Sequence, residues 1–378
     1  NDLLEGGTVQ DTVNGGNGDD TIVMLVTAGD VDEVHGGSNT ANGDTLALSG
    51  TVPGDHVVVV NLSLADQVVS IGGTLDNILT QDGFENLDAS GLGSSVNATG
   101  DGNANILIGS NGNDTLSGGG GNDTLRGGAG DDTIDGGAGG DRIDFSDATG
   151  GINFTLNQGT NSGGFWSTGV LPGLGTDSYR NIEGVFGTNF NDTLTGSSGN
   201  DVIRGNGGDD SINGGDGNDT IRGGDGNDTI DGGAGSGDLI SFQDSTVVGV
   251  GINFTVVQSS SDTVVDLTTF GLGTDTYRNI EGVSGTNFND TLTGSGGNDI
   301  IRGGIGDDTI DGGAGAADLL DLSDGTAGII FTLTNDIIDT TVDLSSIGLS
   351  TAAGDTYKNM EGVIGTNFND TLTGSAND

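Results

Sequence analysis

The residues most able to do chemistry in this chain are aspartates that recur every nine residues beside glycine. Between Gly196 and Asp231 four units follow one another: GSSGNDVIR, GNGGDDSIN, GGDGNDTIR and GGDGNDTID. Each unit has small residues in positions one to four, Asp at position six and an aliphatic residue at position eight. A short carboxylate beside glycine, whose bare backbone lets carbonyl oxygens turn toward a cation, supplies the hard oxygen ligands that calcium prefers.

The same unit recurs outside this run, so the pattern predicts many metal ligands. The sixth-position and equivalent carboxylates are Asp11, Asp20, Asp114, Asp123, Asp132, Asp141, Asp192, Asp201, Asp210, Asp219, Asp228, Asp238, Asp290, Asp299, Asp308, Asp318 and Asp370. The glycines whose region would supply carbonyl oxygens are Gly119, Gly121, Gly128, Gly130, Gly208, Gly215, Gly217, Gly224, Gly226, Gly304 and Gly306. Asp32 and Asp44 are weaker candidates because the repeat decays after Val23, and Asn105 stands where an Asp would be expected.

The unit also predicts its own local structure. Thr220–Arg222 should form a short strand with Ile221 facing inward and its neighbours facing outward. If two units complete one coil, units eighteen residues apart stack with a strand spacing of roughly 4.8 Å. That stacking brings like carboxylates such as Asp201 and Asp219 close together, which is repulsive unless a cation lies between them.

The nonapeptide resembles the calcium-binding repeat of the RTX (repeats-in-toxin) family. The resemblance implies an all-β fold, a right-handed parallel β-roll or β-solenoid in which calcium bridges the turns of successive same-side units. It implies the following pairs: Asp201 with Asp219, Asp210 with Asp228, Asp114 with Asp132, Asp123 with Asp141, Asp290 with Asp308 and Asp299 with Asp318. The units before Asp238 and Asp318 each contain one extra residue, so we expect their sites to be distorted or missing.

Composition supports a fold that depends on cations. The 378 residues include 78 Gly, only 2 Pro and no Cys, and the formal net charge is −48. Glycine without a three-residue period excludes collagen, and the absence of Cys excludes disulfides and thiolate metal sites. So large an uncompensated charge opposes a compact state, so we expect the chain to fold only when multiple Ca²⁺ ions bind. The sign of the charge excludes nucleic acid as a partner, and no apolar run is long enough for a transmembrane helix.

Longer segments interrupt the nonapeptides, and we call these segments cassettes. Three copies of GTNFNDTLTGS, which begin at Gly187, Gly285 and Gly365, follow cassettes 2, 3 and 4. The predicted order is an RTX segment at 1–44, cassette 1 at 45–99, RTX at 100–144, cassette 2 at 145–186, RTX at 187–241, cassette 3 at 242–284, RTX at 285–320, cassette 4 at 321–364, and a further RTX start at 365–378. Both ends fall inside repeat-like sequence, so we expect the chain to be part of a longer protein.

The cassettes alternate apolar and polar residues, as solenoid strands with one buried face do. We therefore expect them to continue the solenoid as wider rungs, with variable middles at 161–174, 259–271 and 336–354 looping out. The alternative is that each cassette forms a small separate sandwich. Arg204 and Arg222 end units two apart and should stack on one outer face.

The sequence contains no recognisable pairing of a nucleophile with a base and no phosphate-binding loop, so we expect no enzymatic activity. The family resemblance implies a calcium-dependent structural module of a secreted bacterial cell-surface protein, located outside the cell and folded on calcium after type I export. Such a module belongs to a surface layer, an extracellular filament or sheath, or an adhesin stalk, where its partners would be calcium and other copies of itself. The alternative is a folding and secretion tail of a secreted lipase, protease or polysaccharide epimerase. Position three carries no threonine column, which argues against an ice-binding adhesin.

Overall fold

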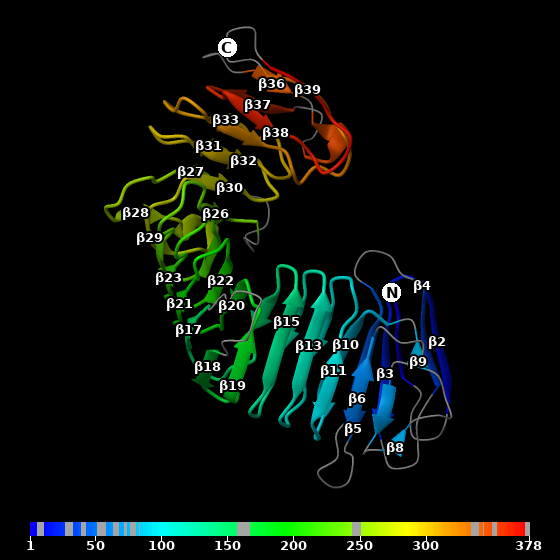
Figure 1. The fold of residues 1–378 in the computed structure, drawn as a ribbon. Helices are drawn as coiled ribbons and strands as arrows, with labels where there is room; N and C mark the ends of the chain where they lie inside the picture. Colours follow the sequence, from blue (N-terminus) through cyan, green and yellow to red (C-terminus); the bar gives the residue numbers. More distant parts are fainter. Residues whose placement is uncertain are drawn as a thin grey trace. The chain divides into compact units, whose positions relative to one another are not determined.

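The computed structural model describes residues 1–5, 11–26, 33–38, 43–50, 58–62, 68–71, 74–75, 81–82, 84–156, 167–243, 251–333, 340–342, 344–349 and 354–374. The chain forms two compact units, Asn1–Thr188 and Asn189–Asp378. Within the described ranges the regular structure is β apart from two single turns of 3₁₀ helix, η1 (Thr268–Phe270) and η2 (Ser345–Ile347). The fold is all-β, as predicted (Figure 1).

In the first unit one long parallel sheet stacks strands from successive coils. In spatial order its strands are β1 (Leu3–Glu5), β3 (Thr21–Val26), β5 (Thr45–Gly50), β10 (Asn86–Leu92), β12 (Ile106–Ile108), β14 (Thr124–Arg126), β16 (Arg142–Asp144) and β20 (Gly184–Phe186). A second sheet contains β18 (Ser167–Leu171), β19 (Gly175–Arg180), β15 (Thr133–Ala138), β13 (Thr115–Gly120), β11 (Val96–Thr99), β6 (Val58–Asn61), β7 (Val68–Ile71) and β8 (Thr74–Leu75). A third contains β2 (Thr12–Asn17), β4 (Glu33–Ser38) and β9 (Gln81–Asp82), and β17 spans Asn153–Thr155.

The second unit repeats this arrangement. One stack contains β22 (Val202–Gly207), β24 (Thr220–Asp225), β26 (Leu239–Ser241), β30 (Gly282–Ser284), β32 (Ile300–Arg302), β34 (Leu319–Asp321) and β38 (Gly362–Ile364). A second contains β21 (Thr193–Thr195), β23 (Ser211–Asn213), β25 (Thr229–Asp231), β29 (Thr274–Arg278) and β28 (Thr263–Asp266). A third contains β27 (Asn253–Thr255), β31 (Thr291–Thr293), β33 (Thr309–Asp311), β37 (Asp355–Lys358) and β36 (Thr340–Val342), and β35 (Ile330–Thr332) pairs with β39 (Thr371–Thr373).

Two nonapeptides complete one coil, as the repeat predicts. In β22 and β24 Ile203 lies opposite Ile221, and in β23 and β25 Ile212 lies opposite Ile230, both pairs eighteen residues apart. All four isoleucines are buried, with at most 2% of their surface exposed. The same register places Arg204 opposite Arg222 on the outer side, which confirms the expected stacking of these two residues. Each coil therefore adds one layer to a thin but continuous aliphatic core.

The cassettes continue this parallel stacking, which confirms the prediction of wider rungs. In cassette 2, β19 pairs in parallel with β15 and β20 pairs in parallel with β16. In cassette 3, β29 pairs with β25 and β30 with β26, and in cassette 4, β37 pairs with β33 and β38 with β34. The described parts of the variable middles include β18, β28 and β36, which pair antiparallel with β19, β29 and β37. A cassette is thus a coil with an added strand at the edge of its sheet.

Aromatic side chains fill the wider rungs. Phe145, Phe154 and Tyr179 pack with ring centroids 4.9–5.6 Å apart in cassette 2. In cassette 3, Phe254 lies 5.0 Å from Phe242 and 5.4 Å from Tyr277. Larger rings at these positions occupy the volume that a longer coil encloses, so burial of apolar surface continues across the cassettes.

Several predicted features lie outside the described residues. These are Asp32 and parts of the cassette middles. In cassette 1, Val58 and Val60 of β6 are buried, as the alternation of apolar and polar residues requires. Along the described part of the chain, no helix has the length and apolar character needed to cross a membrane.

Candidate metal centre

The position-six carboxylates line up in the turns along each side of the stack, in what we call carboxylate columns. One column of the second unit contains Asp192, Asp210, Asp228 and Asp275, and the other contains Asp201, Asp219, Asp238 and Glu281. In both columns the backbone N–H of each aspartate donates to a carboxylate oxygen of the acid one coil further on. These N···O distances are 2.8–2.9 Å in the first column, and 2.8, 2.8 and 3.1 Å in the second.

All six pairs expected from the family resemblance are neighbours in these columns. The backbone N–H of the first aspartate donates to Oδ1 of the second in Asp114–Asp132, Asp123–Asp141, Asp201–Asp219, Asp210–Asp228, Asp290–Asp308 and Asp299–Asp318, at 2.8–2.9 Å. The weaker candidate Asp44 also belongs to a column, since its Oδ1 accepts the N–H of Asp20 at 2.7 Å. One oxygen of each carboxylate is therefore used to hold successive turns together. Whether these residues bind metal stays a prediction.

The other carboxylate oxygen, Oδ2, has no protein partner in most interior positions of the columns. Among the described residues this holds for Asp20, Asp44, Asp123, Asp132, Asp141, Asp210, Asp219, Asp228, Asp238, Asp308 and Asp318. All of these side chains are buried, with at most 3% of their surface exposed. A buried, unpaired carboxylate oxygen is costly in free energy, so its regular recurrence indicates that a ligand normally satisfies it.

Position-one glycines line a cradle next to these oxygens. A Cβ atom added to Gly118 would lie 2.1 Å from Oδ2 of Asp123 and would also collide with the carbonyl oxygen of Gly136 in the next coil. The space beside Gly205 is bounded in the same way by Asp210 Oδ2 and the carbonyl oxygen of Gly223. Carboxylate and carbonyl oxygens from two coils thus converge on a gap that only glycine leaves open, and these are the oxygen types that calcium coordinates.

Glycine has a different purpose at positions two and four. Gly215 and Gly224 at position two have φ of 107° and 108°, and Gly217 and Gly226 at position four have φ of 112° and 138°. Of the eleven glycines predicted to contribute carbonyls, Gly306 alone does not adopt a left-handed φ. Position one needs glycine for space, whereas positions two and four need it for backbone conformation.

Without a cation these carboxylates resist ionisation. Burial raises the pKa of Asp132, Asp210 and Asp308 to about 8, against an ordinary 3.8, and nearby aspartates add to the shift. Burial likewise raises the pKa of Asp219 and Asp228 to about 7. The backbone N–H bonds lower these pKa values, but burial is the larger effect in each case. A divalent cation would supply the positive charge that these oxygens lack.

The first aspartates of a block differ from the interior ones. In the unit of Asp201, Ser197 at position two donates through its N–H to Oδ2 at 2.6 Å and places its hydroxyl 2.9 Å from the same oxygen. The same contact of a position-two backbone N–H with Oδ2 occurs in Ser110–Asp114, Thr286–Asp290 and Ser295–Asp299. A serine or threonine at position two therefore satisfies the oxygen that remains unpaired when position two is Gly or Asn.

Each column ends on a cassette residue that sequence reasoning missed. One column ends at Asp177 in cassette 2 and at Asp275 in cassette 3. Their Oδ2 atoms each accept the hydroxyl of a tyrosine two residues on, at 2.6 Å from Tyr179 and Tyr277 respectively. The other column ends at a glutamate. The recurring sequence Asp-x-Tyr-Arg/Lys-Asn-Ile/Met-Glu-Gly supplies the last acid of both columns. Its three copies in cassettes 2, 3 and 4, each with the same Asp and Glu, were the available signal.

Two expectations about weak sites need correction or refinement. The extra residue before Asp238 does not disrupt its column, because Asp238 Oδ1 still accepts the N–H of Asp219 at 2.8 Å and Ile221 still lies opposite Ile240. The unit of Asp318 behaves in the same way. The turn absorbs the insertion before the strand begins. Asn105 does occupy the column, where its Nδ2 donates to the Glu85 carbonyl oxygen at 2.6 Å.

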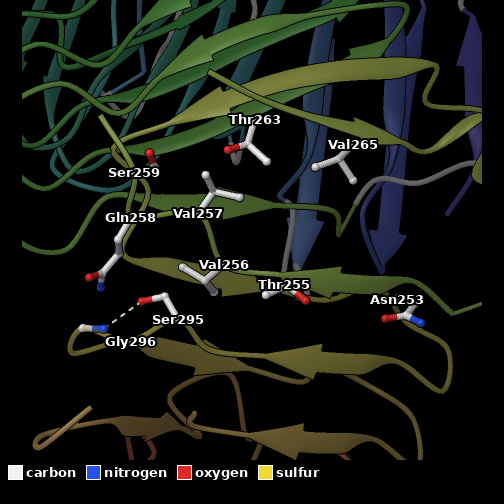
Figure 2. A pocket seen from close by; sticks show the side chains of 11 residues that line it. Asn253, Thr255, Val256, Val257, Gln258, Ser259, Thr263, Val265, Ser295 and Gly296 are labelled. Carbon is white, nitrogen blue, oxygen red and sulfur yellow. Dashed lines mark hydrogen bonds between the residues drawn. The ribbon is translucent and has the colours of Figure 1, made fainter. Parts of the chain in front are cut away.

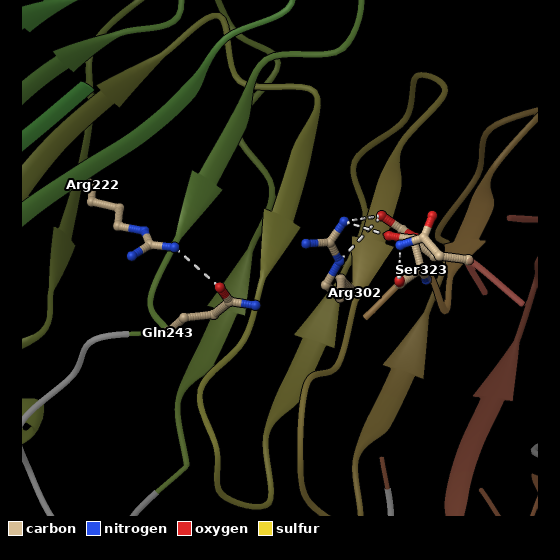
Figure 3. A network of polar contacts seen from close by, with 6 residues as sticks. Arg222, Gln243, Arg302 and Ser323 are labelled. Carbon is tan, nitrogen blue, oxygen red and sulfur yellow. Dashed lines mark hydrogen bonds and ion pairs between the residues drawn. The ribbon is translucent and has the colours of Figure 1, made fainter. Parts of the chain in front are cut away.

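The outer faces carry a separate set of polar contacts. Arg302 bonds to Asp321 and to the Ser323 hydroxyl, and Arg222 donates to Gln243 at 3.1 Å (Figure 3). Arg278 lies 2.8 Å from Asp231 and Lys358 lies 3.4 Å from Asp311. Because these pairs are partly exposed, each contributes little to stability.

A groove of about 580 Å³ lies on cassette 3 between β27, β28 and the turn at Ser295. Figure 2 shows Val256 and Val257 among its lining residues, with Gln258 beside Ser295. The amide of Gln258 also donates to Oδ1 of Asp299 at 3.0 Å. The lining contains hydroxyl, amide and aliphatic groups and no charged side chain. This groove is therefore distinct in chemistry from the carboxylate columns.

Within the described ranges, no three acidic, His or Cys side chains gather at one point. A cation in a column must therefore take part of its coordination from backbone carbonyl oxygens, which the glycine cradles provide. The residues present thus fit calcium, whose 6–8 oxygen ligands tolerate flexible geometry.

The stacked coils and their columns define a calcium-binding β-roll. A family model of the RTX calcium-binding nonapeptide repeat, four copies long, matches residues 1–23, 99–134, 108–143, 186–221, 205–239 and 284–319. The chain therefore contains RTX calcium-binding repeats in several copies, and their cofactor is calcium, with several ions implied by the number of copies. RTX repeat proteins are typically secreted. A comparison with curated proteins finds no match.

Proposed function

We propose that this chain is a non-catalytic, calcium-folded scaffold of a bacterial cell-surface protein, within a surface layer, an extracellular filament or sheath, or an adhesin stalk. The observation that carries the proposal is the continuity of the roll. Nonapeptide blocks and cassettes share the same parallel strand stacking and the same carboxylate columns. A solenoid of this kind extends by adding coils, which suits a structural element.

Calcium dependence suits a protein that is exported unfolded by type I secretion. In the cytosol, where free calcium is low, the repulsion within the columns would keep the chain unfolded. Outside the cell, millimolar calcium would occupy the columns and drive folding. Other copies of the chain are the proposed partners in the surface assembly.

The first test is a calcium titration of the purified chain followed by circular dichroism. We expect a largely disordered spectrum in EGTA and a β-sheet spectrum in millimolar calcium, with several ions bound per chain by elemental analysis. An unchanged spectrum together with no bound calcium would overturn the calcium-folding step.

The second test addresses location. Antibodies against the chain should label intact cells of the source bacterium in a lattice, sheath or fibre, and calcium chelation should release the label. Recovery of the protein only as free molecules in the medium would contradict the scaffold proposal and favour the alternative, a secretion tail of a secreted enzyme.

A further inference from the structure

Four times along the chain a carboxylate column passes from a position-six aspartate to a cassette glutamate. The pairs are Asp44–Glu85, Asp141–Glu183, Asp238–Glu281 and Asp318–Glu361. In each pair the backbone N–H of the aspartate donates to Oε2 of the glutamate, at 2.9, 2.9, 3.1 and 2.9 Å respectively. The four glutamates lie outside the residues that the repeat family model matches.

The backbone fixes the glutamate at every junction in the same way. The N–H groups of Glu281 and Gly282 both donate to the carbonyl oxygen of Asp238, each at 2.9 Å. The corresponding two N–H groups at the other three junctions donate to the carbonyl oxygens of Asp44, Asp141 and Asp318 at 2.8–3.2 Å. The glutamate therefore stands where the next position-six aspartate of the column would stand.

An independent observation points to a ligand at each junction. All four aspartates are fully buried, at 0% exposed surface, and the Oδ2 of each has no partner among the described residues. At the three later junctions a backbone carbonyl faces the same turn. A Cβ atom added to Gly136, Gly232 or Gly312 would collide with the carbonyl oxygen of an asparagine two residues before the glutamate.

These asparagines are Asn181, Asn279 and Asn359, and they adopt left-handed φ of 53°, 52° and 53°. A non-glycine residue held in this conformation indicates a constrained turn. The side-chain amide of Asn279 donates to Asp231 at 2.7 Å, and those of Asn181 and Asn359 donate to Asp135 and Asp311 at the same distance. The turn that presents the carbonyl oxygen is therefore fixed from outside the column.

We propose that each junction binds a calcium ion of its own, with the cassette glutamate as a ligand in place of a nonapeptide aspartate. This inference rests on the proposed calcium-dependent folding of the roll. The aspartate Oδ2, the glutamate carboxylate and, in the later cassettes, the asparagine carbonyl supply hard oxygen ligands of the type that calcium selects. The binding capacity of the roll then extends beyond its nonapeptides into every cassette.

The test is to replace the glutamate by its neutral isostere and count bound calcium. Glu281→Gln keeps an oxygen that can accept the N–H of Asp238 but removes the charge. The variant therefore distinguishes a role of Glu281 as a calcium ligand from a role as a hydrogen-bond acceptor alone. We expect E281Q to bind about one ion fewer per chain at micromolar free calcium, measured by equilibrium dialysis with elemental analysis. The variant E85Q/E183Q/E281Q/E361Q should bind about four ions fewer.

Glu5→Gln is the matched control, because Glu5 lies exposed on β1 outside any column, and its calcium count should equal that of the wild type. An unchanged count and binding midpoint in E281Q would overturn the junction sites while leaving calcium folding intact. A wild-type chain that binds no calcium would overturn both. Should the fourfold variant fail to fold, the single variants E281Q and E361Q decide the question, since one lost site in a solenoid affects mainly its neighbours.

Discussion

Asp201 and Asp219 are neighbours in one column and differ in what satisfies their Oδ2. In the nonapeptide that contains Asp201, Ser197 donates to Asp201 Oδ2 through its N–H at 2.6 Å. In the interior unit, position two is Gly215, and Asp219 Oδ2 has no partner among the described residues. The column therefore begins on a carboxylate satisfied by protein and continues on carboxylates that protein alone leaves unsatisfied.

The difference shows that position two of the nonapeptide selects between two ways of stabilising the same carboxylate. A hydroxyl residue at position two closes a local turn onto the aspartate four positions later, as Ser and Thr side chains commonly do. A residue with left-handed φ, such as Gly224 at 108° or Asn206 at 76°, opens the turn and leaves the oxygen for a cation. At the far end of the block, Tyr277 again satisfies the carboxylate by protein alone. Interior units should thus depend on calcium most.

The largest expected effect comes from removing calcium, which empties all interior sites at once. The stability of the folded roll should then change with pH in one direction without calcium and in the opposite direction with calcium. The pKa of Asp132, Asp210 and Asp308 is raised to about 8 in the folded chain without metal, above 3.8 for an unfolded aspartate. A carboxyl group whose pKa is raised by folding contributes its full stabilisation at pH values below its pKa in the unfolded chain. This contribution is lost as the pH rises through its pKa in the folded chain. The metal-free roll should therefore be more structured at about pH 5 than at about pH 8.5.

With calcium the trend should reverse, because protons compete with the cation for the same oxygens. Thermal unfolding followed by circular dichroism in calcium-free and millimolar-calcium buffers checks both arms. A metal-free chain that is more stable at the higher pH would show that the buried oxygens are satisfied by something other than a proton or a cation.

A smaller effect should separate the interior position from the first one. Asp219→Asn keeps an oxygen to accept the N–H of Asp201 but replaces the unpaired Oδ2 by a donor, so we expect a loss of about one or two bound ions per chain. Asp201→Asn should leave the count nearly unchanged, because its Oδ2 already has protein donors. Asn105 demonstrates that an asparagine fits the column, since its own N–H donates to Asp123 Oδ1 at 2.8 Å. Equal losses in the two variants would mean that position two does not select the calcium sites.

The sequence sufficed for the roll and for the aspartate pairs, because both follow from a period of nine with an aliphatic residue at position eight. Ile203 opposite Ile221 and Asp201 beside Asp219 need only the assumption of two units per coil. The column ends could not be derived in this way. Asp132 bonds to Asp177, 45 residues later in the sequence, and Asp238 bonds to Glu281, 43 residues later. These separations in sequence depend on how the cassette folds and not on a local repeat.

The extra residue in the unit of Asp238 shows a related limit of counting residues. The count predicts a distorted or missing site, whereas in the structure the turn absorbs the extra residue and Ile240 stays opposite Ile221. The buried aliphatic column and the bond from Asp219 N–H to Asp238 fix the strand more strongly than the length of the turn does. The sequence also shows a serine at position two in GSSGND and GSGGND. Its role cannot be inferred until the contact between the serine and the aspartate is known.

The tyrosine that contacts Asp275, the last acid of the other column in this block, gives an intermediate effect. Tyr277→Phe keeps the ring that packs 5.4 Å from Phe254 and removes only the hydroxyl that donates to Asp275 Oδ2 at 2.6 Å. Loss of a buried hydrogen bond to a carboxylate should cost about 1.5–3 kcal/mol. Denaturant unfolding in saturating calcium measures it. We expect the number of calcium ions bound per chain to stay constant. Loss of an ion would instead show that Asp275 binds calcium, as the interior aspartates are proposed to do.

The smallest effect should come from replacing Ser197, the position-two serine that contacts Asp201. Ser197→Ala removes the hydroxyl that lies 2.9 Å from Asp201 Oδ2 and accepts the N–H of Gly199 at 3.1 Å, while the backbone N–H of residue 197 still reaches the carboxylate. Loss of a partly exposed hydroxyl should lower the free energy of unfolding by about 0.5–1.5 kcal/mol. Ser198→Ala, at the exposed neighbouring position, is the matched control. Because the hydroxyl and a cation are alternative partners of one carboxylate, the loss in S197A should be larger in low calcium than in saturating calcium. An equal loss in both would show that the hydroxyl only rigidifies the turn.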